Sequence, residues 1–241
     1  MNQKVDFAGI QVDNVSIDEA TTQVLTWLNS GQAHLVTTPN PEIIVTSQND
    51  LGLKNIINQS DLAVPDGISM VVVSKILGRP LKERVSGIDL MLAMLSKVAP
   101  LGKKVFLLGS APGVAEEAAV NLKAKFPGLN IVGIQDGYFR DDVEMIRQIR
   151  TLAPDLLFVG LGAGRQERWL KLHLKELNVP VSMVIGGSLD VISGRKKRAP
   201  RWTQVLYIEW LYRLLTEPQR WKRQLALPKF LWLTLGRGKK T

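Results

Sequence analysis

Residues 61–70 have the sequence DLAVPDGISM, which predicts a strand that turns directly into a helix. The apolar run stops at Pro65, which cannot donate a sheet hydrogen bond and is expected to end the pairing there. Gly67 then opens a helical segment, Ile68–Leu77. Asp66 thus stands at the carboxyl end of a strand, where open α/β sheets bind ligands. Its carboxylate can accept a proton or a ligand hydroxyl, or it can cap the helix, and this stretch leaves both roles open.

The alternation of short apolar runs with helical patterns recurs through the first 194 residues. At least five repeats favour an open, mostly parallel sheet with helices on both faces, a Rossmann-like α/β fold. Helices are expected at 17–29 behind the capping box Ser16-Ile17-Asp18-Glu19, and at 42–49, 53–59, 68–77, 87–98 and 113–126. Strands are expected at Val5–Val12, His34–Thr38, 61–64, Lys103–Gly109, Asn130–Gln135, Asp155–Gly162 and Val181–Gly186.

Composition excludes several kinds of site. The chain has 241 residues, 45% of them apolar, which is enough for a large core. It has no cysteine and only two histidines, His34 and His173, so disulfides, thiolate chemistry and a histidine metal site are not expected. The beginning of the chain lacks a signal-peptide pattern, and no run approaches the roughly 18 apolar residues of a membrane span. We therefore expect a cytoplasmic protein that needs no metal and no cofactor.

The positive charge is concentrated at the C-terminal end. Residues 195–241 carry thirteen Lys or Arg against Glu209 and Glu217, a net charge of +11, whereas residues 1–194 have a net charge of −2. Four of the six Trp residues lie in the same segment. Basic residues interleaved with Trp and Leu are typical of a segment that binds an anionic membrane surface, although nucleic acid would attract the same cations. We expect a catalytic domain at 1–194 and a basic, Trp-rich helical appendage at 195–241.

The predicted strands end in small or polar residues. Glycine at such points lets the backbone approach a ligand, and the N-termini of the following helices attract phosphate. We therefore expect a nucleotide as the ligand. The alternative is that strand-to-helix loops need glycine and caps in any such protein. The strand ends are Thr38-Pro39-Asn40, Pro65-Asp66-Gly67, Gly109-Ser110-Ala111, Gly162-Ala163-Gly164 and Gly186-Gly187-Ser188.

Common nucleotide motifs are missing. Residues 107–113 lack the G-x-G-x-x-G spacing of a dinucleotide site, and no triphosphate-binding P-loop occurs. The chain also lacks the D-x-D pair that holds a divalent cation on many sugar nucleotides. A diphosphate leaving group would then have to be neutralised by arginine, lysine and helix termini, which the sequence supplies in Arg84, Arg165 and the C-terminal segment.

Several motifs, in order and over nearly the whole chain, resemble the WecG/TagA/CpsF glycosyltransferase family. One position departs from the family pattern, because Gly164 stands where Pro is usual, and a looser loop is expected there. The matching pieces are Thr38-Pro39-Asn40, Pro65-Asp66-Gly67, 83–87, 108–109, Gly137-Tyr138-Phe139, 162–167, 186–190, Gly194, Arg198-Ala199-Pro200 and 209–213.

The resemblance implies an inverting transfer of N-acetylmannosamine, or its uronic acid, from UDP to N-acetylglucosamine on undecaprenyl diphosphate, forming a β-1,4 link. The product would enter wall teichoic acid or a related surface polymer. The enzyme would work at the inner face of the cell membrane, on an anionic surface, and could form a homo-oligomer. Membrane docking and closure of the site by the appendage would be one event, with the appendage ordered only at the surface.

The resemblance also implies residue roles. Asp66 would be the general base on the acceptor C4 hydroxyl, with Thr38 and Arg84 beside it as catalytic residues. Inversion needs one base opposite the leaving group, which a carboxylate on a rigid strand end can supply. The substrate-binding residues would be Asn40, Gly109, Tyr138, Gln166, Gly186 and Asp190, with Arg213, Arg220 and Arg223 closing over the diphosphate.

Plainer roles remain open for these residues. Asp66 can be only a helix cap, Thr38 only a strand-end hydroxyl, and Arg84 only a partner of Glu83 or Asp89. Two other functions also compete: a nicotinamide-dependent oxidoreductase, which the missing fingerprint disfavours, and a nucleic-acid-binding protein that uses the basic segment.

Overall fold

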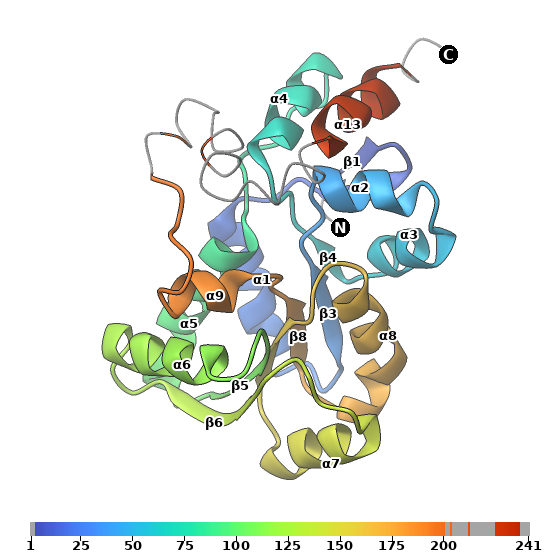
Figure 1. The fold of residues 1–241 in the computed structure, drawn as a ribbon. Helices are drawn as coiled ribbons and strands as arrows, with labels where there is room; N and C mark the ends of the chain where they lie inside the picture. Colours follow the sequence, from blue (N-terminus) through green and yellow to red (C-terminus); the bar gives the residue numbers. More distant parts are fainter. Residues whose placement is uncertain (1–2, 201–202, 204–211, 213–224, 237–241) are drawn as a thin grey trace.

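The computed structural model describes residues 3–200, 203, 212 and 225–236 (Figure 1). Its centre is a six-stranded sheet in the order β4-β3-β8-β7-β5-β6, and all neighbouring strands pair in parallel. The predicted α/β fold is therefore confirmed. The strands are β3 (His34–Thr37), β4 (Leu62–Ala63), β5 (Lys104–Gly109), β6 (Asn130–Gln135), β7 (Leu156–Gly160) and β8 (Val181–Val184).

Helices cover both faces of the sheet because successive strand side chains point to opposite sides. In β5, Val105 and Leu107 face one hydrophobic cluster, whereas Phe106 and Leu108 face another. The first cluster is covered by α1 (Ile17–Trp27), α5 (Gly87–Val98), α6 (Val114–Lys125) and α9 (Ser188–Ile192). The second is covered mainly by α7 (Asp142–Leu152) and α8 (Arg165–Leu177).

A third hydrophobic cluster lies beyond β4, where the N-terminal hairpin packs against helices from both ends of the chain. The helices are α2 (Pro41–Ser47), α3 (Leu51–Asn58), α4 (Ile68–Ile76) and α13 (Ala226–Leu235). Phe230 of α13 is fully buried, and its ring stacks on Phe7 with centroids 5.9 Å apart. Part of the predicted C-terminal appendage therefore belongs to this core.

The prediction of one strand over Val5–Val12 is wrong. The segment forms an antiparallel hairpin of β1 (Lys4–Phe7) and β2 (Ile10–Asp13). Ala8 and Gly9 turn the chain with φ values of 55° and 85°, and the Gly9 N–H donates to the Asp6 carboxylate. The buried side chains at 5, 7, 10 and 12 change parity across this turn, which is the signal that the prediction missed.

The predicted helices are otherwise confirmed to within a few residues. The capping box before α1 is present, since Ser16 Oγ accepts from the Glu19 N–H and the Glu19 carboxylate accepts from the Ser16 N–H. Helix α5 has the predicted bounds, Gly87–Val98. Among the described helices, none has the length and apolar character needed to cross a membrane.

The hairpin is anchored to the sheet by Asp13, which is 2% exposed and whose carboxylate accepts from the Ala63 N–H at 2.9 Å. We predict that Asp13→Ala lowers the free energy of unfolding by about 2–3 kcal/mol, because the buried N–H loses a charged acceptor. Asp13→Asn keeps an acceptor and should cost less than about 1 kcal/mol. Urea denaturation checks both values, and an equal loss in the two variants would contradict this anchoring role.

The pH dependence of the same variants gives a second readout. Burial raises the pKa of Asp13 above 3.8, against the opposing hydrogen bond from Ala63 and the charge of Lys4. The native state therefore holds this proton more tightly than the unfolded state, so the contribution of Asp13 to stability falls as pH rises from 3.8 through the folded pKa. Denaturation of Asp13→Asn over the same pH range should lack this decline.

Candidate active site

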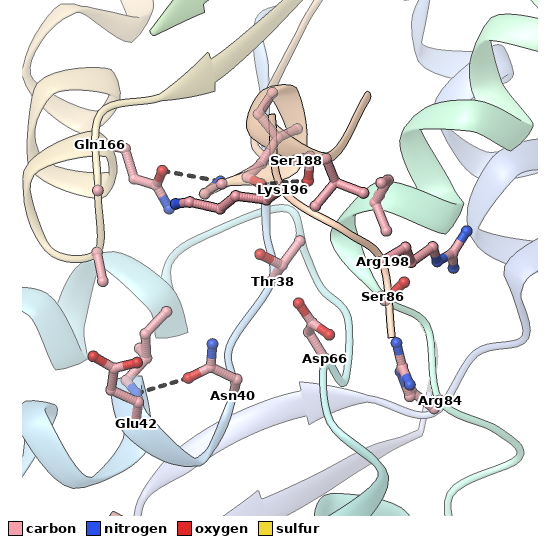
Figure 2. Close-up of a pocket in the computed structure, with 18 of the residues that line it drawn as sticks. Thr38, Asn40, Glu42, Asp66, Arg84, Ser86, Gln166, Ser188, Lys196 and Arg198 are labelled. Atoms are coloured by element: carbon pink, nitrogen blue, oxygen red, sulfur yellow. Dashed lines mark hydrogen bonds between the residues drawn. The ribbon is translucent and has the colours of Figure 1, made fainter. Parts of the chain in front are cut away.

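A polar pocket lies at the carboxyl ends of β3, β4, β7 and β8, the edge at which parallel α/β sheets bind ligands (Figure 2). It brings together six of the predicted site residues: Thr38, Asn40, Asp66, Arg84, Gln166 and Gly186. The remaining lining residues are Glu42, Ile43, Ser86, Ile88, Gly162, Ala163, Ile185, Gly187, Ser188, Val191, Lys196, Lys197 and Arg198.

Asp66 is held beside Thr38 by backbone pairing between two strand ends. The Val64 N–H donates to Thr37 O at 2.9 Å, and the Asp66 N–H donates to Pro39 O at 3.0 Å. The prediction that pairing stops at Pro65 is therefore wrong. In a parallel pair alternate residues face the neighbouring strand, so the missing donor of Pro65 falls on the side away from β3.

Helix α4 begins without Asp66 at its cap position. The N-cap residue is Gly67, with φ 153° and ψ 130°, and Asp66 precedes it. Figure 2 shows the carboxylate of Asp66 directed into the pocket, near the side chain of Thr38. Thr38 is 6% exposed, lines the pocket, and has its side chain close to Gly87, the first residue of α5.

Asn40 both caps helix α2 and lines the pocket. Its Oδ1 accepts from the Ile43 N–H at 3.0 Å and caps α2, whose first residue is Pro41. This hydrogen bond fixes which end of the amide carries the nitrogen, and the Nδ2 group is the end available to the pocket, as Figure 2 shows. Asn40 therefore presents a hydrogen-bond donor to a ligand.

Gln166 joins the loop after β7 to the loop after β8. Its Oε1 accepts from the Gly186 N–H at 3.2 Å, and its Nε2 donates to Glu167 Oε1 at 2.9 Å. The other carboxylate oxygen of Glu167 accepts from the Gly164 N–H at 2.6 Å. Burial raises the pKa of Glu167, although these hydrogen bonds oppose the shift. Glu167 thus sets the position of Gln166 and of the loop.

The backbone at Gly164 shows why this chain has glycine at a position where the family usually has proline. It has φ 82°, and its N–H is the donor to Glu167. Proline has neither this conformation nor this donor. The hydrogen bond to the buried Glu167 joins the loop to the start of α8, and the looser loop stays a prediction.

Three cations of the basic C-terminal segment, which the sequence analysis did not single out as site residues, line the pocket. Lys196, Lys197 and Arg198 follow α9, and Arg198 forms an ion pair with Asp89 of α5. Burial raises the pKa of Asp89, but the hydrogen bonds from Ser86 and Arg198 and the charge of Arg84 outweigh it and leave the pKa lowered. Of the two plainer partners of Arg84, Asp89 feels its charge, whereas Glu83 accepts from the Ile17 N–H at 2.5 Å.

Three predicted residues lie outside the pocket lining. Gly109 ends β5 and Tyr138 follows β6, and the Gly137 N–H donates to Ser110 O between them. Asp190 lies in α9 and accepts from Ser110 Oγ. Tyr138 is 71% exposed. Arg165 also faces this side, since its guanidinium donates to Gly137 O at 3.0 Å. The predicted arginines 213, 220 and 223 lie outside the described residues.

Some strand-end glycines are required by packing rather than by a ligand. A Cβ at Gly109 would lie 2.3 Å from Gly160 O, and one at Gly160 would lie 2.5 Å from Gly186 O. Gly162 differs, because it lines the pocket and a Cβ there would meet nothing within 4 Å. Strand packing alone therefore requires glycine at positions 109 and 160, whether or not a ligand binds there.

The pocket chemistry is that of an ionic site with a carboxylate beside hydroxyl and amide groups. Its lining holds the carboxylates of Glu42 and Asp66 and the cations of Arg84, Lys196, Lys197 and Arg198. Neither histidine is part of the lining. Within the described part of the chain, no cluster of three or more His, Asp or Glu side chains could hold a metal ion. Such a pocket suits a polar, anionic ligand with hydroxyl groups.

A parallel sheet with helices on both faces and a polar pocket at its carboxyl edge defines the chain as an open α/β protein with a candidate ligand site. The chain belongs to the glycosyl transferase WecG/TagA/CpsF family, whose model matches residues 5–241. The chain is therefore a transferase by family.

Three relatives carry the name N-acetylglucosaminyldiphosphoundecaprenol N-acetyl-beta-D-mannosaminyltransferase. The one from Bacillus spizizenii is 38% identical over 210 residues, covering 87% of this chain and 82% of the relative. The one from Bacillus subtilis is 34% identical over 205 residues, covering 85% and 80%. The one from Staphylococcus aureus strain NCTC 8325 is 33% identical over 231 residues, covering 95% and 91%.

The glycines allow a test that separates folding from binding. We predict that Gly109→Ala lowers the free energy of unfolding by more than about 3 kcal/mol, because its Cβ collides with a backbone carbonyl at φ 131°. Gly162→Ala should cost only about 1 kcal/mol for its positive φ, and should weaken ligand binding. Chemical denaturation and UDP titration check this pair, and equal stability of the two variants would refute the packing role of Gly109.

Proposed function

We propose that the protein transfers N-acetylmannosamine from UDP-N-acetylmannosamine to the C4 hydroxyl of N-acetylglucosamine on undecaprenyl diphosphate, with inversion to a β-1,4 link. The observation that carries the proposal is the Asp66 carboxylate, directed into a pocket with Thr38 and Asn40 in a chain of this family. The names of the relatives support the acceptor and the transferred sugar. The product enters wall teichoic acid or a related cell-surface polymer.

In this proposal Asp66 takes the proton from the acceptor C4 hydroxyl as its oxygen attacks the anomeric carbon. The bond from that carbon to the UDP oxygen breaks with its electron pair, and UDP leaves from the opposite face. A single base suffices for inversion. The backbone hydrogen bond from Asp66 to Pro39 holds the carboxylate on a rigid element, which favours the short approach that proton transfer needs.

Thr38 and Asn40 flank this base and orient the acceptor sugar, with Asn40 donating to a sugar oxygen. Arg84 adds positive charge from the far side of Asp66. Gln166 and Gly186, which are linked to each other, form the wall against which the transferred sugar lies.

In this proposal the nucleotide binds at the carboxyl ends of β5 and β7, next to the pocket. From β5 the chain continues outward to β6, whereas from β7 it continues to β8 on the other side, so strand order reverses at this point. Such a switch point is where open α/β sheets bind nucleotides. Gly109, Tyr138 and Asp190 lie around it, next to the pocket, which agrees with a nucleotide role rather than contact with the reacting sugar.

We propose that the reaction needs no metal. Charge on the leaving UDP is then balanced by cationic side chains, including Arg84 and the arginines 213, 220 and 223 of the appendage. Residues 1–194 act as the catalytic domain and residues 195–241 as the appendage, although α13 of the appendage packs on α2 and α4. The uronic acid of the same sugar remains the alternative donor.

Because the acceptor is a lipid in a bilayer, we propose that the protein binds the inner face of the cell membrane. Helices α4 and α13 are neighbours and expose apolar side chains, with Ile76 64% and Trp232 74% exposed. Lys75, Arg79 and Lys229 are exposed on or beside the same helices and complement anionic lipid. Helix α4 starts directly after Asp66, so a lipid that leaves the pocket along α4 reaches this surface.

The base is tested by Asp66→Asn with UDP-N-acetylmannosamine, a short-chain acceptor and EDTA present. We predict that acceptor-dependent UDP release falls by about 10²–10⁴-fold, because the variant cannot take the proton, while the Kd for UDP stays within about twofold. Glu42→Gln, the other pocket carboxylate, should lose less than about tenfold. If Glu42→Gln abolishes release and Asp66→Asn retains it, Asp66 is not the base. Loss of native activity in EDTA would contradict metal independence.

The membrane surface is tested with the double variant Ile76→Ser/Trp232→Ser and vesicles of phosphatidylglycerol and phosphatidylcholine. We predict that bound protein in a sedimentation assay falls by about tenfold, because two apolar side chains no longer insert. Leu172→Ser on α8, which is 76% exposed, is the matched control and should bind as the native protein does. Binding that vanishes with salt and ignores lipid composition would favour the nucleic-acid alternative.

A further inference from the structure

Residues 194–198, Gly194-Arg195-Lys196-Lys197-Arg198, form a strap that is fixed at both ends. At one end the Arg195 guanidinium makes two hydrogen bonds of 2.8 Å to the Glu117 carboxylate on α6. At the other end Arg198 pairs with Asp89 on α5. These carboxylates belong to two different helices, so the strap passes from one helix to the other beside the pocket.

Between the two fixed ends, Lys196 and Lys197 line the pocket. The Lys196 N–H donates to Asp190 O at 2.8 Å, which holds its backbone, and its Nζ lies 3.6 Å from Asp190 Oδ1. Figure 2 shows Lys196 reaching from the strap toward Gln166, on the other side from Arg198. Among the described carboxylates, none forms an ion pair with Lys197.

We propose that Lys196 and Lys197 bind the diphosphate group of a substrate. The inference rests on the proposed function, which requires two diphosphate esters near this pocket: the donor nucleotide and the lipid acceptor. The strap presents two adjacent ammonium groups on a backbone that is already ordered, so little entropy is lost when they meet a phosphate. This site is distinct from the predicted arginines at 213, 220 and 223.

The position of the strap favours the donor diphosphate. Asp190, which contacts Lys196, also accepts from Ser110 Oγ at 3.3 Å. Ser110 comes directly after β5, at the proposed nucleotide site. Arg84 and Arg198 lie on the side of Asp66 and Ser86, where Arg198 pairs with Asp89 of α5. The lysines therefore line the pocket on the side where Lys196 contacts Asp190, next to the proposed nucleotide site, and the diphosphate of a bound sugar nucleotide has to lie between that site and the reacting sugar.

The test measures binding of UDP and of uridine by calorimetry to Lys196→Gln, Lys197→Gln and the double variant of the full chain. Each single change should weaken UDP binding by about tenfold, the loss of one charge-assisted hydrogen bond, and leave uridine binding unchanged. Lys123→Gln, an exposed lysine on α6, is the matched control for the change in net charge. The substituted lysines lie at the pocket surface, and equal thermal unfolding temperatures confirm that the variants fold.

A second arm separates the two sources of diphosphate. Steady-state kinetics with the short-chain acceptor gives the acceptor KM for the same variants. Weaker UDP binding with an unchanged acceptor KM assigns the lysines to the donor, whereas a raised acceptor KM with unchanged UDP binding assigns them to the lipid diphosphate. If neither quantity changes in an active double variant, the strap proposal is wrong and the proposed function stands. If the native protein neither binds UDP nor transfers sugar, both proposals are wrong.

Discussion

The hydrogen bond from the Asp66 N–H to Pro39 O, 3.0 Å long, is the contact on which the pocket depends. It continues the parallel pairing of β3 and β4 beyond the last strand residues and past two prolines. Pro65 is tolerated because its carbonyl accepts from the Val85 N–H and its nitrogen faces away from β3. The pairing sets Asp66 against Thr38 and Asn40 before any ligand arrives.

Close backbone contacts also shape the other side of the pocket. Gly109, Gly160 and Gly186 let the ends of β5, β7 and β8 approach one another so closely that a methyl group at the first two would collide with a carbonyl. The buried Glu167 then fixes both Gly164 and Gln166. Although burial disfavours a charged carboxylate, its two oxygens accept from the Gly164 N–H and from Gln166 Nε2, and these hydrogen bonds hold the loop against the start of α8.

Local sequence patterns are sufficient to predict the sheet and the part of the pocket that contains the proposed general base, Asp66. Asp66, Thr38 and Asn40 come directly after buried runs, so they could be placed at strand ends, and parallel strands bring those ends together. The hairpin at Ala8–Gly9 was missed because the change of side-chain parity is weaker than the apolar content of residues 5–12. Lys196 and Lys197 could not be singled out within the basic C-terminal segment for a different reason: the ion pairs of Arg195 with Glu117 and of Arg198 with Asp89, far away in the chain, determine where the strap lies. No local rule reveals such pairs.

Because Asn40 caps α2, it can determine which way a sugar hydroxyl in the pocket directs its O–H bond. Since Oδ1 is held by Ile43, the pocket meets the amide only through its N–H bonds, and the amide cannot turn over without breaking the cap. A sugar oxygen held between Asn40 and an ionised Asp66 must accept from one and donate to the other. Its O–H bond then has one orientation, toward the carboxylate, so a helix cap determines the polarity of the group that reacts in the proposed transfer.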